Sequence, residues 1–220
     1  RGGARGLRGV GRAGGGGGGS VGRGEGFIFS SLYVLQFEKG IYCPDTAKTF
    51  GRNVLFKGCE IALELSAPNT ATNNTHLWHH IHGTDCGTLV KVSGGHATLI
   101  IGDTSQVTTV LDAFNSMVDV KGGQIESSTE VINATGSKIT VSNMQVLNGT
   151  VLIPFHLHTR SVLHLLNVEQ SASGAIQPVA KLHDNTCSAF GVPDMQMFGF
   201  SNFSETKYQV ELWNGQKVHL

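Results

Sequence analysis

Histidine is the side chain with the greatest potential for chemistry in this sequence. Four of the ten histidines fall within seven residues, namely His76, His79, His80 and His82. Alternate residues of a β-strand point to the same face, so His80 and His82 could form a two-ligand clip for a transition metal. His156 and His158 have the same spacing and could form a second clip. The sequence thus contains two candidate metal-binding pairs.

The residues around these pairs do not complete a metal site. Asp85 and Cys86 are the carboxylate and thiol that follow His82, and a protein zinc site usually has at least three protein ligands. We therefore expect no bound metal and no other cofactor. Such histidines more commonly lie on the surface or between subunits, where their protonation would make assembly depend on pH.

Carboxylates are the second group that could do chemistry. Glycoside hydrolysis needs two carboxyl groups about 5–9 Å apart. Glu126 follows Asp103 by slightly more than one unit of the repeat described below, so the two could lie near each other on adjacent coils. The other acids of this region are scattered, at Asp112, Asp119 and Glu130, and no basic residue accompanies them in an adjacent column. Acidic side chains at solvated corners of the coils explain such a distribution, so we expect that the protein is not an enzyme. If it is one, Asp103 and Glu126 are the catalytic candidates.

These residues must be positioned by a 21-residue repeat in the middle of the chain. When the chain is divided at Gly87, Thr108, Thr129 and Thr150, equivalent positions of the segments are apolar and form columns in the alignment. The columns are Leu89, Val110, Val131 and Leu152; Val90, Leu111, Ile132 and Ile153; Val92, Ala113, Ala134 and Phe155; Ala97, Val118 and Ile139; Leu99, Val120 and Val141; and Ile125 with Val146. A fixed period of this length indicates a solenoid, in which equivalent residues stack on one another.

Within each unit the apolar residues alternate as they do in strands. The segment from Val118 to Ile125 predicts two short strands that meet at a bend near Gly123, and segments 139–146 and 54–61 repeat the pattern. Gly, Asn, Ser and Asp at the breaks turn the chain through corners. A coil of three short strands and three turns needs roughly 20–25 residues. The sequence therefore predicts an all-β protein, a right-handed parallel β-helix that forms a single-stranded solenoid of about seven 21-residue coils.

The predicted β-helix covers residues 27–205 and is flanked by two different segments. Residues 1–26 contain fourteen glycines and five arginines (Arg1, Arg5, Arg8, Arg12 and Arg23) against one acid. This composition favours a flexible arm, whose positive charge suggests that it contacts another molecule. Residues 206–220 alternate around Asn214-Gly215, a strong hairpin signal, and predict a hairpin that caps the open end of the solenoid.

Other features of the composition exclude several classes of protein. Four cysteines, Cys43, Cys59, Cys86 and Cys187, show no CxxC spacing and are too few for a disulfide scaffold, so we expect reduced and mostly buried thiols. The longest apolar runs are far shorter than the roughly 18 residues that a membrane span needs. Residues 1–26 contain no apolar stretch typical of a signal peptide. We expect no membrane association.

The segment from Val34 to Tyr42 contains the apolar strand, the glycine and the aromatic residue that often begin β-helices of the pectate-lyase type. With the 21-residue coils, it makes the chain resemble the right-handed parallel β-helix spike proteins of viruses. These include phage tailspikes and the β-helical capsid-decorating proteins of some adenoviruses. The resemblance covers about residues 28–205 and rests on pattern, without a diagnostic motif. It implies a homotrimer whose N-terminal arms dock on the virus particle.

Three functions are compatible with this resemblance. The first is a non-enzymatic structural protein of the virion surface, a trimeric spike or capsid-decorating protein whose basic arm binds other virion proteins and which contacts a host receptor or glycan. The second is a tailspike-type polysaccharide depolymerase, a glycoside hydrolase or lyase. The third is a cellular adhesin. The small number of coils favours the structural protein, and Trp78 and Phe198 are expected to face outward into its lateral contacts.

Overall fold

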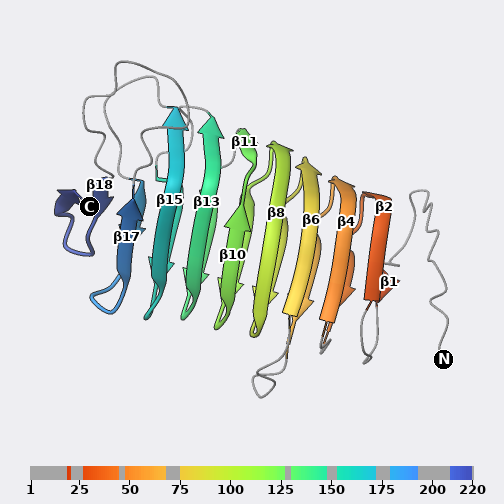
Figure 1. Ribbon diagram of the computed structural model, residues 1–220, viewed down its shortest axis with the longest axis horizontal. Coiled ribbons are helices and arrows are strands. Elements are labelled where there is room, and N and C mark those ends of the chain that lie inside the picture. The colour runs from red at the N-terminus through yellow and green to blue at the C-terminus, as the bar shows by residue number, and fades with distance from the viewer. Residues whose placement is uncertain are drawn as a thin grey trace.

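The computed structural model describes residues 19–20, 27–44, 48–67, 75–126, 130–147, 153–171, 179–192 and 209–219. Over these ranges the chain forms strands and turns, and none of it is helical. Successive strands stack side by side into one elongated solenoid (Figure 1). The all-β class is therefore confirmed.

Two hydrogen-bonded sheets form the walls of the solenoid. Sheet A contains, in spatial order, β1 (Gly19–Ser20), β3 (Lys39–Cys43), β5 (Ile61–Ser66), β7 (Thr88–Ser93), β9 (Thr109–Phe114), β12 (Glu130–Thr135), β14 (Phe155–His158), β16 (Ala180–Leu182), β18 (Gln209–Glu211) and β19 (Lys217–His219). Sheet B contains β2 (Phe27–Leu35), β4 (Lys48–Lys57), β6 (Thr75–Thr84), β8 (His96–Ser105), β10 (Met117–Lys121), β13 (Lys138–Leu147), β15 (Val162–Ser171) and β17 (Ser188–Val192). The short strand β11 (Gln124–Glu126) continues the layer of β10 between β8 and β13.

The path of the chain has a fixed hand. In Figure 1 it climbs through sheet B at the front and returns through sheet A behind, while it advances from right to left. Viewed from the N-terminal end, this is a clockwise path that moves away from the viewer. The protein is thus a right-handed parallel β-helix, as the sequence predicts.

Three columns of left-handed residues mark corners of the described coils, although β8 has none at its middle. The first bends sheet B at the middle of its long strands and contains Ser31, Asn53, His80, Gly122, Asn143 and Asn167. The second leads from sheet B to sheet A and contains Gln36, Gly58, Asp85 and Gln106. The third leads back to sheet B and contains Gly94, Asn115, Gly136 and Arg160. The coil from β6 to β7 has all three corners, at His80, Asp85 and Gly94, and thus three sides as predicted, but two of the sides belong to one bent sheet.

Inward-facing apolar columns fill the space between the sheets. The register pairs the predicted columns of the regular coils, Ala97 with Val118 and Ile139, and Leu99 with Val120 and Val141. All of these side chains are buried. The columns are thus confirmed from residue 88 to residue 147, whereas Leu152, predicted in one of them, lies outside the described residues.

The prediction is wrong in the fourth coil, where it placed Ile153 and Phe155 in two columns. Phe155 instead pairs with Ile132, and Leu157 pairs with Ala134, so the register is shifted by two residues. The cause is a longer connection: seven residues separate β13 from β14, two more than separate β11 from Ile132. A constant period cannot anticipate such an insertion.

Trp78 points into the core, contrary to the expectation that it faces outward. Its side chain is fully buried, and its ring stacks on Phe29 with centroids 5.3 Å apart. Gly51 on the intervening layer permits this contact, because a Cβ there would lie 1.9 Å from the indole. The left-handed residue His80 shifts the inward positions of β6 by one, so that Trp78 and Ile81 both face the core. A strict alternation counted back from Ile81 would place Trp78 outside.

The ends of the solenoid are closed by short strands. β1 adds a parallel layer to the N-terminal edge of sheet A by pairing with β3, although it lies within the segment predicted as an arm. At the other end β18 and β19 form the antiparallel hairpin that the sequence predicts, with Gly215 in the left-handed conformation. β18 also pairs in parallel with β16, so the hairpin is the last layer of sheet A. Phe198 lies outside the described residues.

Candidate functional site

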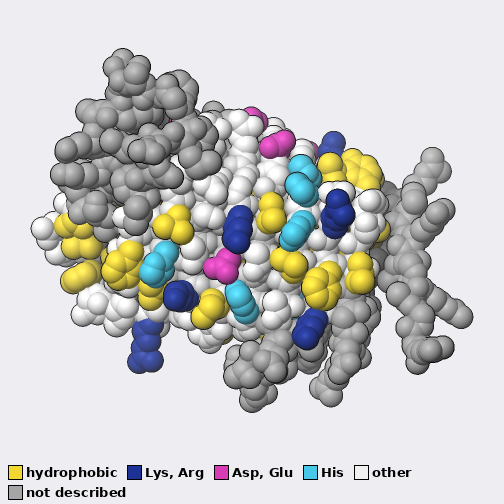
Figure 2. All heavy atoms as spheres, in the orientation of Figure 1, with side chains coloured by type: hydrophobic (Ala, Val, Ile, Leu, Met, Phe, Trp, Pro, Cys, Tyr) yellow, Lys and Arg dark blue, Asp and Glu magenta, His cyan; other side chains and the backbone are white. Residues whose placement is uncertain are grey.

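The outer face of sheet B carries most of the exposed large hydrophobic side chains. Of the nine in the described residues, seven lie on this face: Ile28, Tyr33, Phe50, Leu55, Met117, Leu166 and Phe190. The other two are Phe114 on sheet A and Trp213 in the terminal hairpin. The uneven distribution makes the outer face of sheet B the principal candidate site. Figure 2 views this face and shows hydrophobic side chains recurring along it among charged and histidine side chains.

These hydrophobic residues follow the register of the strands. Ile28, Phe50 and Leu77 stack in the first three layers of one outward column, and Phe190 lies in the last layer of the same column. Their exposed fractions include 77% for Ile28 and 54% for Phe190. Since parallel strands keep equivalent residues one above the other, Ile28, Phe50 and Leu77 form a row of apolar groups over three layers, and Phe190 lies apart from them at the other end of the column.

Polar residues interrupt the row in the middle of the face. Thr98, Asp119 and Thr140 continue the column, and Asp119 Oδ2 lies 3.2 Å from Nε2 of His96 on the adjacent strand. Both side chains are partly exposed, so this contact contributes little to stability. It does place a polar pair between two apolar ends of the same face.

Tyr33 and Leu55 lie beyond the bend of sheet B, on its second side. They are register partners, with exposed fractions of 56% and 37%. The apolar surface at the N-terminal end of sheet B therefore extends over both sides of the bend. We call Ile28, Tyr33, Phe50, Leu55 and Leu77 the N-terminal apolar patch.

The structure brings Asp103 and Glu126 to the same outward side, on adjacent layers. Asp103 pairs with Gln124, and Glu126 pairs with Ser105, so the two carboxylates are diagonal neighbours rather than directly stacked. Diagonal neighbours across a sheet are about 7–8 Å apart at Cα. Both side chains are exposed to solvent. The backbone N–H of Asp103 donates to Nδ1 of His82 at 3.2 Å.

The left-handed corner separates His80 from His82. His80 lies at the bend of sheet B with φ of 55°, so the two residues do not share one continuous strand face. The ring of His82 instead covers Gly102, where an added Cβ would lie 2.3 Å from Cε1. His76, from the same histidine-rich segment, is fully buried and its Nδ1 lies 2.9 Å from Oγ1 of Thr49. The segment is therefore dispersed over the core, the bend and the surface.

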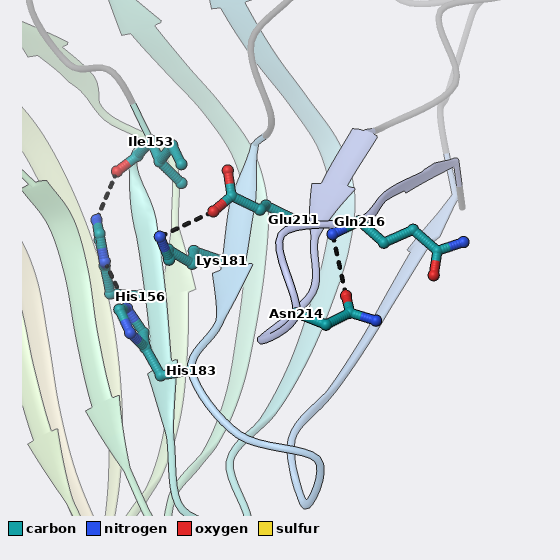
Figure 3. A network of polar contacts seen from close by, with 7 residues as sticks. All are labelled: Ile153, His156, Lys181, His183, Glu211, Asn214 and Gln216. Atoms are coloured by element: carbon teal, nitrogen blue, oxygen red, sulfur yellow. Dashed lines mark hydrogen bonds and ion pairs between the residues drawn. The ribbon is translucent and has the colours of Figure 1, made fainter.

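His156 and His158 do share a face of β14, and the fold adds a third ring to them. His183 stacks on His158 with centroids 4.0 Å apart, and its Nε2 lies 2.9 Å from Nδ1 of His156. Nε2 of His156 lies 3.0 Å from the carbonyl oxygen of Ile153, which can only accept, so this nitrogen carries the proton (Figure 3). With this proton on Nε2, Nδ1 of His156 is the acceptor for Nε2–H of His183.

The surroundings of His183 disfavour its protonation. The pKa of His183 is lowered to about 4 by partial desolvation, although much of the side chain is exposed, and by the neighbouring His158, His156 and Lys181, against a smaller opposing effect of Glu211. Lys181 is itself paired with Glu211, with Nζ 2.8 Å from Oε1 (Figure 3). Within the described ranges, no group of three or more His, Cys, Asp or Glu side chains has a geometry that could hold a metal ion.

A constant 21-residue period does not bring His183 next to His156 and His158. The backbone N–H of His183 donates to the carbonyl of Leu157 at 2.8 Å, which places it one layer above His158 in a C-terminal coil longer than the regular repeat. The expected arm residues Arg1, Arg5, Arg8, Arg12 and Arg23 lie outside the described residues. Among the described residues there is no helix long and apolar enough to span a membrane.

Comparison with known proteins does not assign this chain to a family. No protein-family model, no curated protein and no solved structure matches the chain. We therefore infer the function from the fold and from the side chains described above.

Proposed function

We propose that the protein is a non-enzymatic structural protein, a β-helical spike or capsid-decorating protein of a virus that assembles as a homotrimer through the outer face of sheet B. The observation that carries the proposal is the concentration of seven of the nine exposed large hydrophobic side chains on that face. Exposed apolar rows of this kind on a soluble protein commonly mark interfaces.

A second copy of the chain is the partner that this face suits. Its apolar side chains lie at the two ends of the face, where Ile28, Phe50 and Leu77 are register partners on three successive strands and Phe190 lies in the last layer. Copies packed side by side in parallel would bring equivalent apolar side chains together at both ends of the face. Charge opposes this contact only weakly, since residues 27–220 carry 11 basic and 15 acidic side chains, a formal net charge of −4.

The position of the N-terminal apolar patch favours three copies over two. Phe50 lies before the bend of sheet B, and Tyr33 and Leu55 lie after it. A copy that uses both sides of the bend contacts two neighbours, one with each side, and such a contact closes into a ring. A trimer would also place three N-terminal segments at one end, with five arginines in each of them.

Three phenylalanines provide a matched test of the interface. Phe50 and Phe190 lie in the outward column of sheet B, and Phe114 has a similar exposure on sheet A. In sedimentation velocity at micromolar concentration we expect the parent and Phe114→Glu to be trimers. Phe50→Glu combined with Phe190→Glu should be a folded monomer with unchanged far-UV circular dichroism. A parent chain that sediments as a monomer would remove the trimer from the proposal.

The arm completes the proposal by anchoring the spike. Residues 1–26 carry five arginines and one glutamate, which suits an acidic docking surface. Deletion of residues 1–18 removes Arg1, Arg5, Arg8 and Arg12 but keeps β1. We expect the truncated trimer to form normally and to lose salt-sensitive retention on carboxylated beads. Equal retention of the parent and truncated proteins would contradict an electrostatic anchor.

A tailspike-type depolymerase is the second candidate. It is favoured by the single observation that Asp103 and Glu126 project from adjacent layers on the same side of the solenoid. We expect no release of reducing ends from acidic or neutral capsular polysaccharides and no stabilisation by Ca²⁺. Steady release that Asp103→Asn or Glu126→Gln abolishes would favour the enzyme over the structural protein.

A further inference from the structure

Cys59 and Cys86 occupy equivalent positions on adjacent coils. Two residues before them Lys57 pairs with Thr84, and two residues after them Ile61 pairs with Thr88. The backbone N–H of Gly87 donates to the carbonyl oxygen of Cys59 at 2.9 Å, which holds the two layers together at this corner. The two cysteines are therefore stacked directly on each other.

The stacked arrangement meets the geometric requirement of a disulfide. Strand layers are about 4.8 Å apart, and the Cα atoms of disulfide-bonded cysteines are usually about 4.4–6.8 Å apart. Each thiol points the same way, toward the carbonyl two residues earlier: Cys59 Sγ lies 3.8 Å from the oxygen of Lys57, and Cys86 Sγ lies 3.3 Å from that of Thr84. Both sulfurs thus lie on the same inner side of the corner.

The other positions of this column show that cysteine is not needed for packing. By the same register, Phe37 precedes Cys59 and Val107 follows Cys86. Val107 is as deeply buried as the two cysteines, which are 1% and 2% exposed. Hydrophobic side chains therefore fill the neighbouring layers of this column. Thiols occupy it only in the two adjacent layers of Cys59 and Cys86.

We propose that Cys59 and Cys86 are a disulfide-forming pair that links consecutive coils of the β-helix under oxidising conditions. The other two buried cysteines lie in different columns, where Cys43 is opposite Leu65 and Cys187 adjoins Ser188, the register partner of Val162. The modification is thus specific to one corner of the solenoid.

A low-molecular-weight disulfide such as glutathione disulfide is the oxidant. The neighbouring thiol of Cys86 lowers the pKa of Cys59, which favours Cys59 as the attacking thiolate. Attack breaks the glutathione S–S bond, releases one glutathione and leaves a mixed disulfide on Cys59. Cys86 then loses its proton and attacks Cys59 Sγ, and the second glutathione leaves. The protein loses two electrons and two protons, and glutathione disulfide is reduced to two thiols.

The sulfurs lie just beneath the surface, which gives the oxidant a route to them. Cys59 is flanked by Gly58 and Glu60, both exposed, and Cys86 follows the exposed Asp85. A local opening of this corner, without unfolding of the sheets, uncovers the thiolate. The link would close a loop that runs from Cys59 to Cys86 and includes the segment 68–74.

The experiment oxidises the full-length parent with glutathione disulfide at pH 8 under native conditions, then alkylates it in denaturant and maps the cysteines by mass spectrometry. We expect a peptide that joins Cys59 to Cys86, with Cys43 and Cys187 fully alkylated. The melting temperature should rise by roughly 5–10 °C relative to the reduced protein. Cys86→Val, which copies Val107, should fold, lack the link and show no rise.

The control is Cys43→Ser, which should retain both the link and the rise. Alkylation of Cys59 and Cys86 in the oxidised parent would overturn the proposal, as would a link that involves Cys43 or Cys187. Should Cys86→Val fail to fold, the peptide map of the parent still decides the question. The outcome does not depend on the oligomeric state, because the link lies within one chain.

Discussion

The central coils (residues 88–147) and the first coils (residues 27–84) pack their cores in different ways. In the central coils equivalent positions follow a constant period and hold aliphatic side chains of similar size, such as Leu99, Val120 and Val141. In the first coils the offset changes from one layer to the next, as the pairing of Val54 with Leu32 on one side and with Ile81 on the other shows. There the indole of Trp78 packs over Gly51, and the imidazole of His76 is buried in the core.

The difference shows two ways of satisfying the same stacking geometry. Similar residues pack in identical layers, so the central coils need only a period. The first coils need complementary layers, in which Gly51 leaves the volume that Trp78 fills and Thr49 supplies the hydrogen-bond partner of His76. Titratable and reactive groups are consequently buried in the first coils.

The largest expected effect comes from a charge in a central column. Ile132 is fully buried between Leu111 and Phe155. Ile132→Asp would bury an unpaired carboxylate, so we expect a loss of more than about 4 kcal/mol and no soluble folded protein. The control Ser142→Asp faces outward beside Lys121 and should change stability by less than about 0.5 kcal/mol. Thermal unfolding of the soluble fractions measures both, and a melt of Ile132→Asp within a degree or two of the parent would show that the column is misassigned.

The second effect tests complementarity in the first coils. Trp78→Ala should cost about 3–5 kcal/mol, and Gly51→Ala about 1–3 kcal/mol because its new methyl group clashes with the indole. In the double variant the clash is absent, so Gly51→Ala should cost much less in that background. Urea unfolding of the four proteins gives the coupling free energy. Strictly additive costs would mean that the indole does not determine the need for glycine at this position.

The third effect is a dependence of stability on pH that originates in the first coils. Burial, with a smaller effect of His96, lowers the pKa of His76 from 6.5 to about 4. The unfolded chain takes up a proton as the pH falls through 6.5, whereas the folded chain does so only near pH 4. Stability is therefore lost across that window, on the order of 3 kcal/mol for this group.

His76→Gln should flatten the decline in the free energy of unfolding between pH 7 and pH 4.5. His183→Gln should have the same sign of effect, since the pKa of His183 is also lowered to about 4, but a smaller size, because that ring is exposed to solvent. Urea unfolding at several pH values provides the slopes. Parent and His76→Gln curves of equal slope would exclude His76 as the source.

The smallest effect concerns the corners, which both regions share. Asn143 has φ of 54°, a conformation that asparagine tolerates better than alanine, and its Oδ1 accepts from Nδ2 of Asn167 at 2.9 Å. Asn143→Ala should cost about 1 kcal/mol. Asn143→Gly keeps the conformational freedom and should cost less, and the difference in chemical unfolding separates backbone strain from the hydrogen bond. Equal losses in the two variants would assign the effect to the hydrogen bond.

The candidate site was only partly predictable from the sequence. Lateral apolar contacts were expected, but through Trp78, which is buried, whereas Ile28, Phe50 and Phe190 carry the exposed surface. Those residues belong to the irregular coils at either end, where the period gives no register. The cysteines were correctly predicted to be buried, but the stacking of Cys59 on Cys86 depends on a coil longer than the regular repeat.

The sequence by itself determined the fold class, the inward columns of the central coils and the terminal hairpin. Each of these follows from local alternation or from a constant period, and neither requires knowledge of distant residues. Only the tertiary structure decided the register of the longer coils, the inward position of Trp78 and the meeting of His156, His158 and His183. An inserted residue or a left-handed corner shifts every later side chain by one position, and which layer absorbs that shift depends on packing against neighbouring coils.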